Sequence, residues 1–157
     1  MAEYKNIYFI GIGGIGMSAI ARYYKFKGFE VSGYDRTPSE LTAELVAEGI
    51  DVHYEDNTDF IPKNVEETLV VYTPAIPADL KELVYVQKNG YRVIKRSKTL
   101  GEITRGQKCL AISGTHGKTT TSTIIAKLLE AAGYTVHLGG NIGKPLLCEV
   151  PEFQKDD

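Results

Sequence analysis

Two glycine-rich segments constrain what this chain can fold into. The first is Gly11-Ile12-Gly13-Gly14-Ile15-Gly16, and the second is Gly114-Thr115-His116-Gly117-Lys118-Thr119-Thr120. Each follows a short apolar run and precedes a stretch with helical spacing. A strand, a glycine turn and a helix in this order are typical of α/β domains in which the helix start faces a phosphate. Two such segments on one chain indicate a protein that holds two different phosphorylated ligands.

The first hundred residues alternate apolar runs with helical spacing. This alternation predicts a Rossmann-like α/β fold, a doubly wound parallel sheet covered by helices. The expected strands cover residues 7–10, 30–34, 50–53, 69–72 and 91–94. The expected helices cover residues 15–27, 80–89 and 97–104, with a further helix that opens at 37–40 and ends by Gly49.

The pattern starts again after Arg105-Gly106-Gln107. We expect strands at 109–112 and 135–138 around a helix at 118–132, whose apolar face contains Ile124 and Leu128. A single βαβ unit has too little sheet to bury its own faces. The sequence therefore predicts one complete domain at 1–105 and, at 106–157, the opening βαβ unit of a P-loop ATPase domain. We interpret the chain as part of a longer protein.

The first glycine segment has the spacing of a diphosphate-binding turn. Gly11 is expected to permit the sharp turn, Gly13 to let the backbone approach a diphosphate, and Gly16 to allow close helix–strand packing. Asp35 follows the second strand, where its carboxylate is expected to accept hydrogen bonds from a ribose. The diphosphate of NAD, of FAD or of a UDP-sugar satisfies this motif equally well. The loop Thr73-Pro74-Ala75-Ile76 ends another parallel strand and is expected to line the same crevice.

The second glycine segment departs from the strict P-loop pattern, because Ile112 stands where that pattern has its first glycine. The rest of the pattern is present between an expected strand and an expected helix. Lys118 is expected to reach the β- and γ-phosphates of a nucleoside triphosphate, and the Thr119 hydroxyl to bind Mg²⁺. His116 lies among backbone amides that face phosphate; both a proton-donating role and a loop-filling role remain open.

Composition excludes several other classes. Lys and Arg number 18 against 20 Asp and Glu, which gives a net charge of −2 and no basic surface for nucleic acid. No apolar stretch approaches the roughly 20 residues that span a bilayer. The two cysteines form neither a metal-binding pattern nor a disulfide framework, so we expect a reducing, cytoplasmic location.

Three segments together resemble the Mur ligases of bacterial peptidoglycan synthesis. They are 9–18, with its glycine turn, Ser32-Gly33-Tyr34-Asp35, and 114–121. Within that family, His116 is typical of the members that join L-alanine to UDP-N-acetylmuramate. The resemblance implies a three-domain enzyme that uses ATP and Mg²⁺ to form an acyl phosphate, which the amine of L-alanine then attacks.

Carried onto this sequence, the resemblance assigns two sets of binding residues. The UDP-sugar would contact Gly11, Gly13, Gly14, Ile15, Gly16, Met17, Asp35, Thr73, Pro74, Ala75 and Ile76. ATP would contact Gly114, Thr115, His116, Gly117, Lys118, Thr119 and Thr120, with Lys118 and Thr119 catalytic and Thr119 binding Mg²⁺. By itself, the chain is expected to bind UDP-sugar without catalysing ligation. The alternatives are an NAD-dependent oxidoreductase domain, which leaves Lys118 without a role, and a non-catalytic nucleotide-binding module.

Overall fold

Five parallel strands form the centre of the first domain. The computed structural model describes residues 4–105, 108, 110–136 and 138. The strands occur in the spatial order β3-β2-β1-β4-β5, which confirms the predicted doubly wound parallel sheet. Their bounds are β1 Asn6–Ile10, β2 Glu30–Tyr34, β3 Asp51–His53, β4 Thr68–Tyr72 and β5 Arg92–Lys95.

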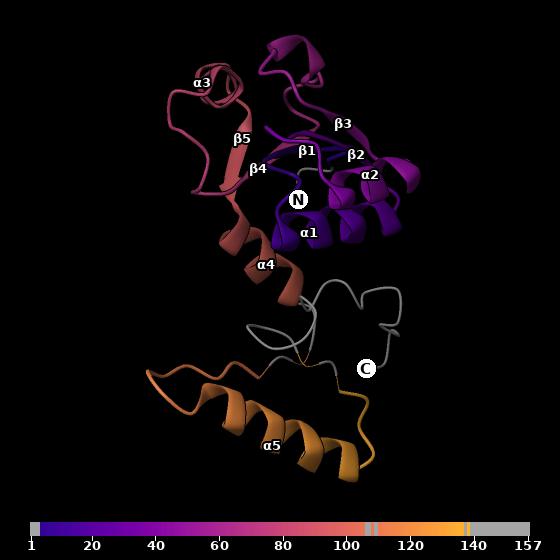
Figure 1. Ribbon diagram of the computed structural model, residues 1–157, viewed down its shortest axis with the longest axis vertical. Helices are drawn as coiled ribbons and strands as arrows, with labels where there is room; N and C mark the ends of the chain where they lie inside the picture. Colours follow the sequence, from indigo (N-terminus) through magenta and orange to yellow (C-terminus); the bar gives the residue numbers. More distant parts are fainter. Residues whose placement is uncertain (1–3, 106–107, 109, 137, 139–157) are drawn as a thin grey trace.

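Helices cover both faces of this sheet (Figure 1). One face carries α1 (Ile15–Phe26) and α2 (Glu40–Ala47), and the other carries α3 (Lys81–Lys88). A 3₁₀ turn, η1 (Thr58–Phe60), follows β3, and α4 (Arg96–Thr104) follows β5 directly. Helix α2 begins where the sequence predicts, because the Ser39 hydroxyl accepts a hydrogen bond from Thr42 N–H and Thr42 bonds back to Ser39 N–H.

Alternate residues of the strands build two cores. Ile7 and Phe9 of β1 pack with Met17, Ile20 and other residues on the α1 side. Tyr8 and Ile10 point to the opposite face and pack with residues of α3. The period of two along a strand explains this division. Both faces of β1 are therefore apolar, as expected for a central parallel strand.

The strand order creates a switch point between β1 and β4. The chain winds outward from β1 through β2 to β3, then returns to β4 on the other side of β1. The loops that leave β1 and β4 consequently diverge at the carboxyl edge of the sheet. In doubly wound sheets, the crevice beside such a point is where ligands bind.

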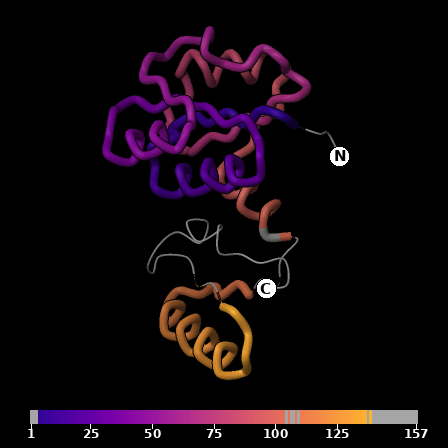
Figure 2. Tube along the Cα trace, turned by 90° about the vertical axis from the view of Figure 1, so that its right-hand side faces the viewer, coloured from indigo at the N-terminus to yellow at the C-terminus, as the bar shows by residue number. Residues whose placement is uncertain are grey.

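The second segment forms its predicted helix but not its predicted strands. Helix α5 spans Lys118–Ala131, close to the expected 118–132, and lies apart from the five-stranded sheet (Figures 1 and 2). Residues 110–112, 135, 136 and 138 are not in strands. This corrects the sequence prediction for those positions: a strand exists only with a hydrogen-bonded neighbour, and these residues have none in the described part of the chain. Cys109, Gly106 and Gln107, which begin the predicted strand and mark the predicted boundary, lie outside the described residues.

The apolar face predicted for α5 is largely solvent-exposed. Ile124 is 54% exposed and Leu128 is 65% exposed. Within the described residues, no helix has both the length and the apolar character needed to cross a membrane.

Candidate functional site

The turn after β1 is held by the end of β2. The N–H groups of Gly11 and Ile12 both donate to the Tyr34 carbonyl oxygen, at 2.8 and 3.0 Å. Gly11 has a φ of +88°, a conformation that residues with a side chain rarely adopt. The predicted role of Gly11 as the residue that permits the sharp turn agrees with this geometry.

Asp35 fixes the glycine turn from the neighbouring strand. Its Oδ2 accepts a hydrogen bond from Gly13 N–H at 2.7 Å, and its Oδ1 accepts one from Thr37 N–H at 3.1 Å. A Cβ atom built on Gly13 would lie 2.7 Å from the same Oδ2. The missing side chain at Gly13 thus makes room for the Asp35 carboxylate, whereas the sequence predicts that it makes room for a diphosphate. The ribose contact of Asp35 stays a prediction.

Helix α1 presents backbone donors at the carboxyl edge. Its first intrahelical bonds are donated by Met17 and Ser18 to the carbonyl of Gly14, which caps the helix without a side chain. The N–H groups of Ile15 and Gly16 precede these bonds and head the positive end of the helix dipole. Met17 differs from the other predicted contacts, since its side chain is buried in the core.

The loop after β4 lies against the glycine turn. A Cβ atom on Gly11 would be 3.0 Å from both Thr73 Cγ2 and Ile76 Cδ1. Residues more than sixty positions apart in the sequence therefore meet at the switch point, as predicted for the loop Thr73–Ile76. Pro74 and Ala75, between them, are exposed.

A cavity of about 460 Å³ opens beside this loop. Ala75 and Ile76 form one side, Tyr34 and Arg36 extend from the end of β2, and Asp56 and Asp79 supply carboxylates. Sequence reasoning found only the first two of these residues. The signal for the others was available: Arg36 and Asp56 follow closely after β2 and β3, so they share the carboxyl edge of the parallel sheet.

A largely buried polar cluster joins the sheet to the start of α3. The Tyr8 hydroxyl donates to Glu82 Oε2 at 2.6 Å, and His53 Nε2 lies 2.8 Å from Glu82 Oε1. Asn57 N–H also donates to Oε1, at 3.2 Å. Because a carboxylate only accepts, the proton of this pair is on His53 Nε2. The cluster ties β1, the end of β3 and the start of α3 together.

Alkaline pH is expected to destabilise the fold through Tyr8. Burial, reinforced by the Glu82 carboxylate, raises the pKa of Tyr8 well above its usual value near 10. Above pH ~10 the unfolded chain loses this proton and the folded chain keeps it. The free energy of unfolding therefore falls by about 1.4 kcal/mol per pH unit from this group alone.

Urea unfolding between pH 9 and 11 measures this slope. Tyr24, whose pKa burial raises to about 12, adds a similar trend. The informative quantity is thus the difference between the parent chain and Tyr8→Phe, which is expected to show the shallower slope. If the free energy of unfolding falls with pH equally steeply in both proteins, Tyr8 is not the source of the effect.

The second glycine segment forms the start of α5. Gly117 has a φ of +76° and caps the helix without a side chain. Thr121 N–H makes the first intrahelical bond, to the Gly117 carbonyl, so the N–H groups of Lys118, Thr119 and Thr120 precede it. The Lys118 ammonium donates to the carbonyls of Gly114 and Thr115 and so lies over the loop. The ammonium group, the helix start and the glycine loop therefore lie together, and their binding of phosphate stays a prediction.

The remaining predicted ATP contacts are exposed around this loop. Thr115, His116, Thr119 and Thr120 are all solvent-accessible. No cluster of three or more His, Cys, Asp or Glu side chains able to hold a metal occurs in the described part of the chain. Among described residues, no hydrogen bond or ion pair joins this segment to residues 11–16 or 73–76.

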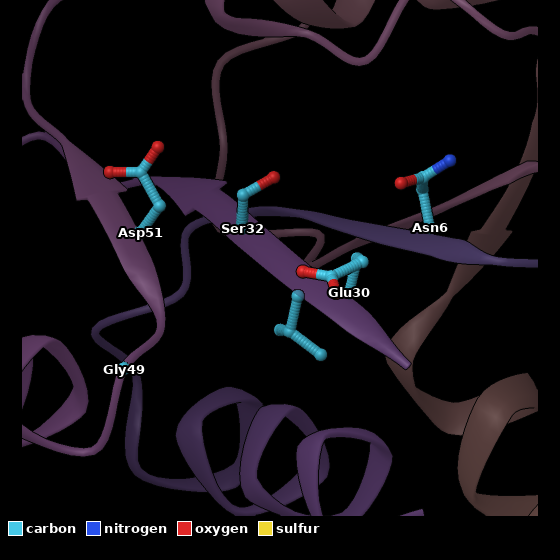
Figure 3. Close-up of a pocket in the computed structure, with 6 residues that line it drawn as sticks. Asn6, Glu30, Ser32, Gly49 and Asp51 are labelled. Atoms are coloured by element: carbon cyan, nitrogen blue, oxygen red, sulfur yellow. The ribbon is translucent and has the colours of Figure 1, made fainter. Parts of the chain in front are cut away.

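A second, smaller cavity of about 270 Å³ lies at the opposite edge of the sheet (Figure 3). Asn6, Glu30 and Asp51 line it, and they are the first residues of β1, β2 and β3. The glycine turn and the β4 loop lie at the other ends of the strands. This cavity is therefore separate from the candidate site.

The sequence matches a known protein family and is similar to several named enzymes. Residues 6–108 match the family described as "Mur ligase family, catalytic domain". A UDP-N-acetylmuramate–L-alanine ligase of Porphyromonas gingivalis strain W83 is 59% identical over 129 residues, which cover 80% of this chain and 28% of the relative. The ligase of the same description from Phocaeicola vulgatus is 52% identical over 151 residues, covering 91% and 33%.

Solved structures show the same relationship. A UDP-N-acetylmuramate-alanine ligase from Thermotoga maritima superposes with a TM-score of 0.64 at 33% identity, over 82% of this chain and 30% of that one. UDP-N-acetylmuramate:L-alanyl-gamma-D-glutamyl-meso-diaminopimelate ligase from Neisseria meningitides gives 0.65 at 30% identity, over 90% and 45%. The chain spans about a third or less of the length of the curated relatives described above.

Proposed function

Because this chain belongs to the Mur ligase family, we propose that it is the UDP-N-acetylmuramate-binding part of an ATP-dependent ligase, together with the phosphate loop of its ATP site. The whole protein would join L-alanine to UDP-N-acetylmuramate in peptidoglycan synthesis. The observation that carries the proposal is the switch point: the glycine turn, the Thr73–Ile76 loop and the adjoining cavity meet there. The names of the relatives, at 52–59% identity, support the choice of substrates.

Different residues of the site would bind the diphosphate and the uridine of the sugar nucleotide. The N–H groups of Ile15 and Gly16 would face the diphosphate, where the helix dipole favours negative charge. The cavity beside Tyr34 and Ile76 would take the uridine, with an aromatic face and an aliphatic wall for the base. Arg36 and Asp56 would supply a donor and an acceptor for its polar edge.

The residues of 114–120 fit the phosphates of ATP. The exposed loop has an ammonium group and free backbone N–H groups at one helix start. The Thr119 hydroxyl makes no hydrogen bond in the described structure, so it is available to Mg²⁺, which prefers oxygen ligands. ATP with Mg²⁺ supplies the phosphoryl group that activates the muramyl carboxylate. The chain's part is to position two anions and to offset their charge.

Partners and location follow from the same proposal. In the whole protein, segments equivalent to those parts of the relatives that this chain does not cover would supply the rest of the ATP-binding domain and the domain that receives L-alanine. The proposed location is cytoplasmic, in keeping with two cysteines that form neither a metal-binding pattern nor a disulfide framework.

Calorimetry with the chain as it stands tests the proposal. We expect saturable heat with UDP-N-acetylmuramate and none with NADH. Tight NADH binding without UDP-sugar binding would instead support the oxidoreductase alternative. No saturable heat with either ligand would also overturn the proposal.

A further inference from the structure

A cationic side chain lies against the first turn of α1. Arg96 is the first residue of α4 and directly follows β5, so it belongs to the carboxyl edge of the sheet. A Cβ atom built on Gly16 would lie 2.7 Å from Arg96 Nη1 and 3.4 Å from Arg96 Cζ. The sequence motif predicts that Gly16 allows helix and strand to pack closely. The group that actually fills the space beside Gly16 is this guanidinium.

Within the described residues Arg96 has no acidic partner, like Arg36 and unlike two other arginines of the domain. Arg22 pairs with Glu44 and Glu48, and Arg92 bonds to Glu102 and to the Tyr4 hydroxyl. Within the described residues, Arg96 forms no hydrogen bond and no ion pair, and its side chain is exposed. A guanidinium has five N–H donors and no acceptor, and its planar fork matches a phosphate with two parallel bonds.

A negative charge already lies beside the glycine turn, so an anionic ligand there would be favoured by a nearby cation. Asp35 uses the Gly13 N–H and places a carboxylate beside the turn. That negative charge opposes the binding of an anion, while the helix start contributes only about +0.5 of a charge. The guanidinium beside Gly16 is a full positive charge near the start of α1, and it would offset that carboxylate.

We propose that Arg96 binds the diphosphate of the UDP-sugar, with one phosphate on its guanidinium and the other at the start of α1. This inference rests on the proposed function and adds a residue to that site. A diphosphate suits the arrangement because it presents two adjacent anionic groups to two adjacent sets of donors. Uridine, which lacks phosphate, would not contact Arg96.

Calorimetry of Arg96→Ala in the full chain tests the inference. Affinity for UDP-N-acetylmuramate is expected to fall about ten- to a hundredfold, the range for hydrogen bonds to a charged group. Affinity for uridine, measured by ligand-observed NMR at millimolar concentration, is expected to change less than twofold. Arg96→Lys should recover only part of the loss, because an ammonium cannot form the paired bonds.

Lys98→Ala is the matched control, since Lys98 is an exposed cation on the same helix and its loss is expected to leave binding unchanged. Thermal unfolding of each variant checks that α4 still folds. Unaltered UDP-sugar affinity in Arg96→Ala, or an equal loss for uridine, would overturn the role of Arg96 while the proposed function stands. If the parent chain does not bind UDP-N-acetylmuramate, both proposals fail.

Discussion

Replacing Glu82 with alanine is expected to lower the free energy of unfolding by about 3–5 kcal/mol, because several hydrogen-bond donors lose their acceptor and each unsatisfied buried donor costs about 1–3 kcal/mol. Glu82 is fully buried and accepts hydrogen bonds from Tyr8, His53 and Asn57. Its loss removes the acceptor that these donors share at a fully buried position. For a domain whose total stability is about 5–15 kcal/mol, this is among the largest effects that a single substitution can have.

Urea unfolding of two further variants makes the test specific. Glu82→Gln keeps one acceptor oxygen and the side-chain shape, so its loss is expected to be smaller. Glu55→Ala removes an exposed carboxylate from the nearby loop and is expected to change stability by at most about 0.5 kcal/mol. A cost for Glu82→Ala as small as that for Glu55→Ala would show that the cluster does not stabilise the fold.

Replacing Lys118 with alanine is expected to lower the ligation rate at least about a hundredfold, as the loss of a preorganised charge at a developing anion does elsewhere. The assay requires a complete enzyme. A suitable one is a chimera in which this chain replaces the aligned segment of the Porphyromonas gingivalis relative. Phosphate release with ATP, UDP-N-acetylmuramate and L-alanine measures the rate.

The control for this experiment is Lys127→Ala, which removes another exposed lysine from α5. Its chimera is expected to keep full activity. Binding of UDP-N-acetylmuramate by Lys118→Ala should also be unchanged, because that ligand is assigned to the β1–β4 switch point. If Lys118→Ala retained more than half of the parent rate, Lys118 would have no catalytic role.

Local sequence predicted the elements of the first domain well. The strand at 30–34 has the predicted bounds, and the other strands and helices differ by a residue or two at their ends. The reason is that apolar runs, helical spacing and caps such as Ser39 act over a few neighbouring residues. The prediction of a strand from Cys109 onward was wrong at 110–112, because strand formation does not depend on local sequence alone. An apolar run describes a tendency, whereas a strand also needs a neighbour to bond to.

The candidate site was only partly predictable. The glycine turn and the Thr73–Ile76 loop were found from their places after apolar strands. Three contacts were not predictable from the sequence: Gly13 with Asp35, Gly16 with Arg96, and Tyr8 with Glu82. Each joins residues that are 22 to 80 positions apart. Arg96 was within reach of the same rule that found Thr73, since it also follows a parallel strand directly.

The amino-acid sequence by itself determined that the first domain consists of βα units and that two helices begin at glycine-rich segments, because backbone preference and apolar periodicity are local properties. Tertiary structure alone decided that β4 returns to the side of β1, that Asp35 holds the glycine turn and that Arg96 lies beside Gly16. Those outcomes depend on how the sheet buries its two faces, and burial is settled by contacts between segments that are distant in the chain.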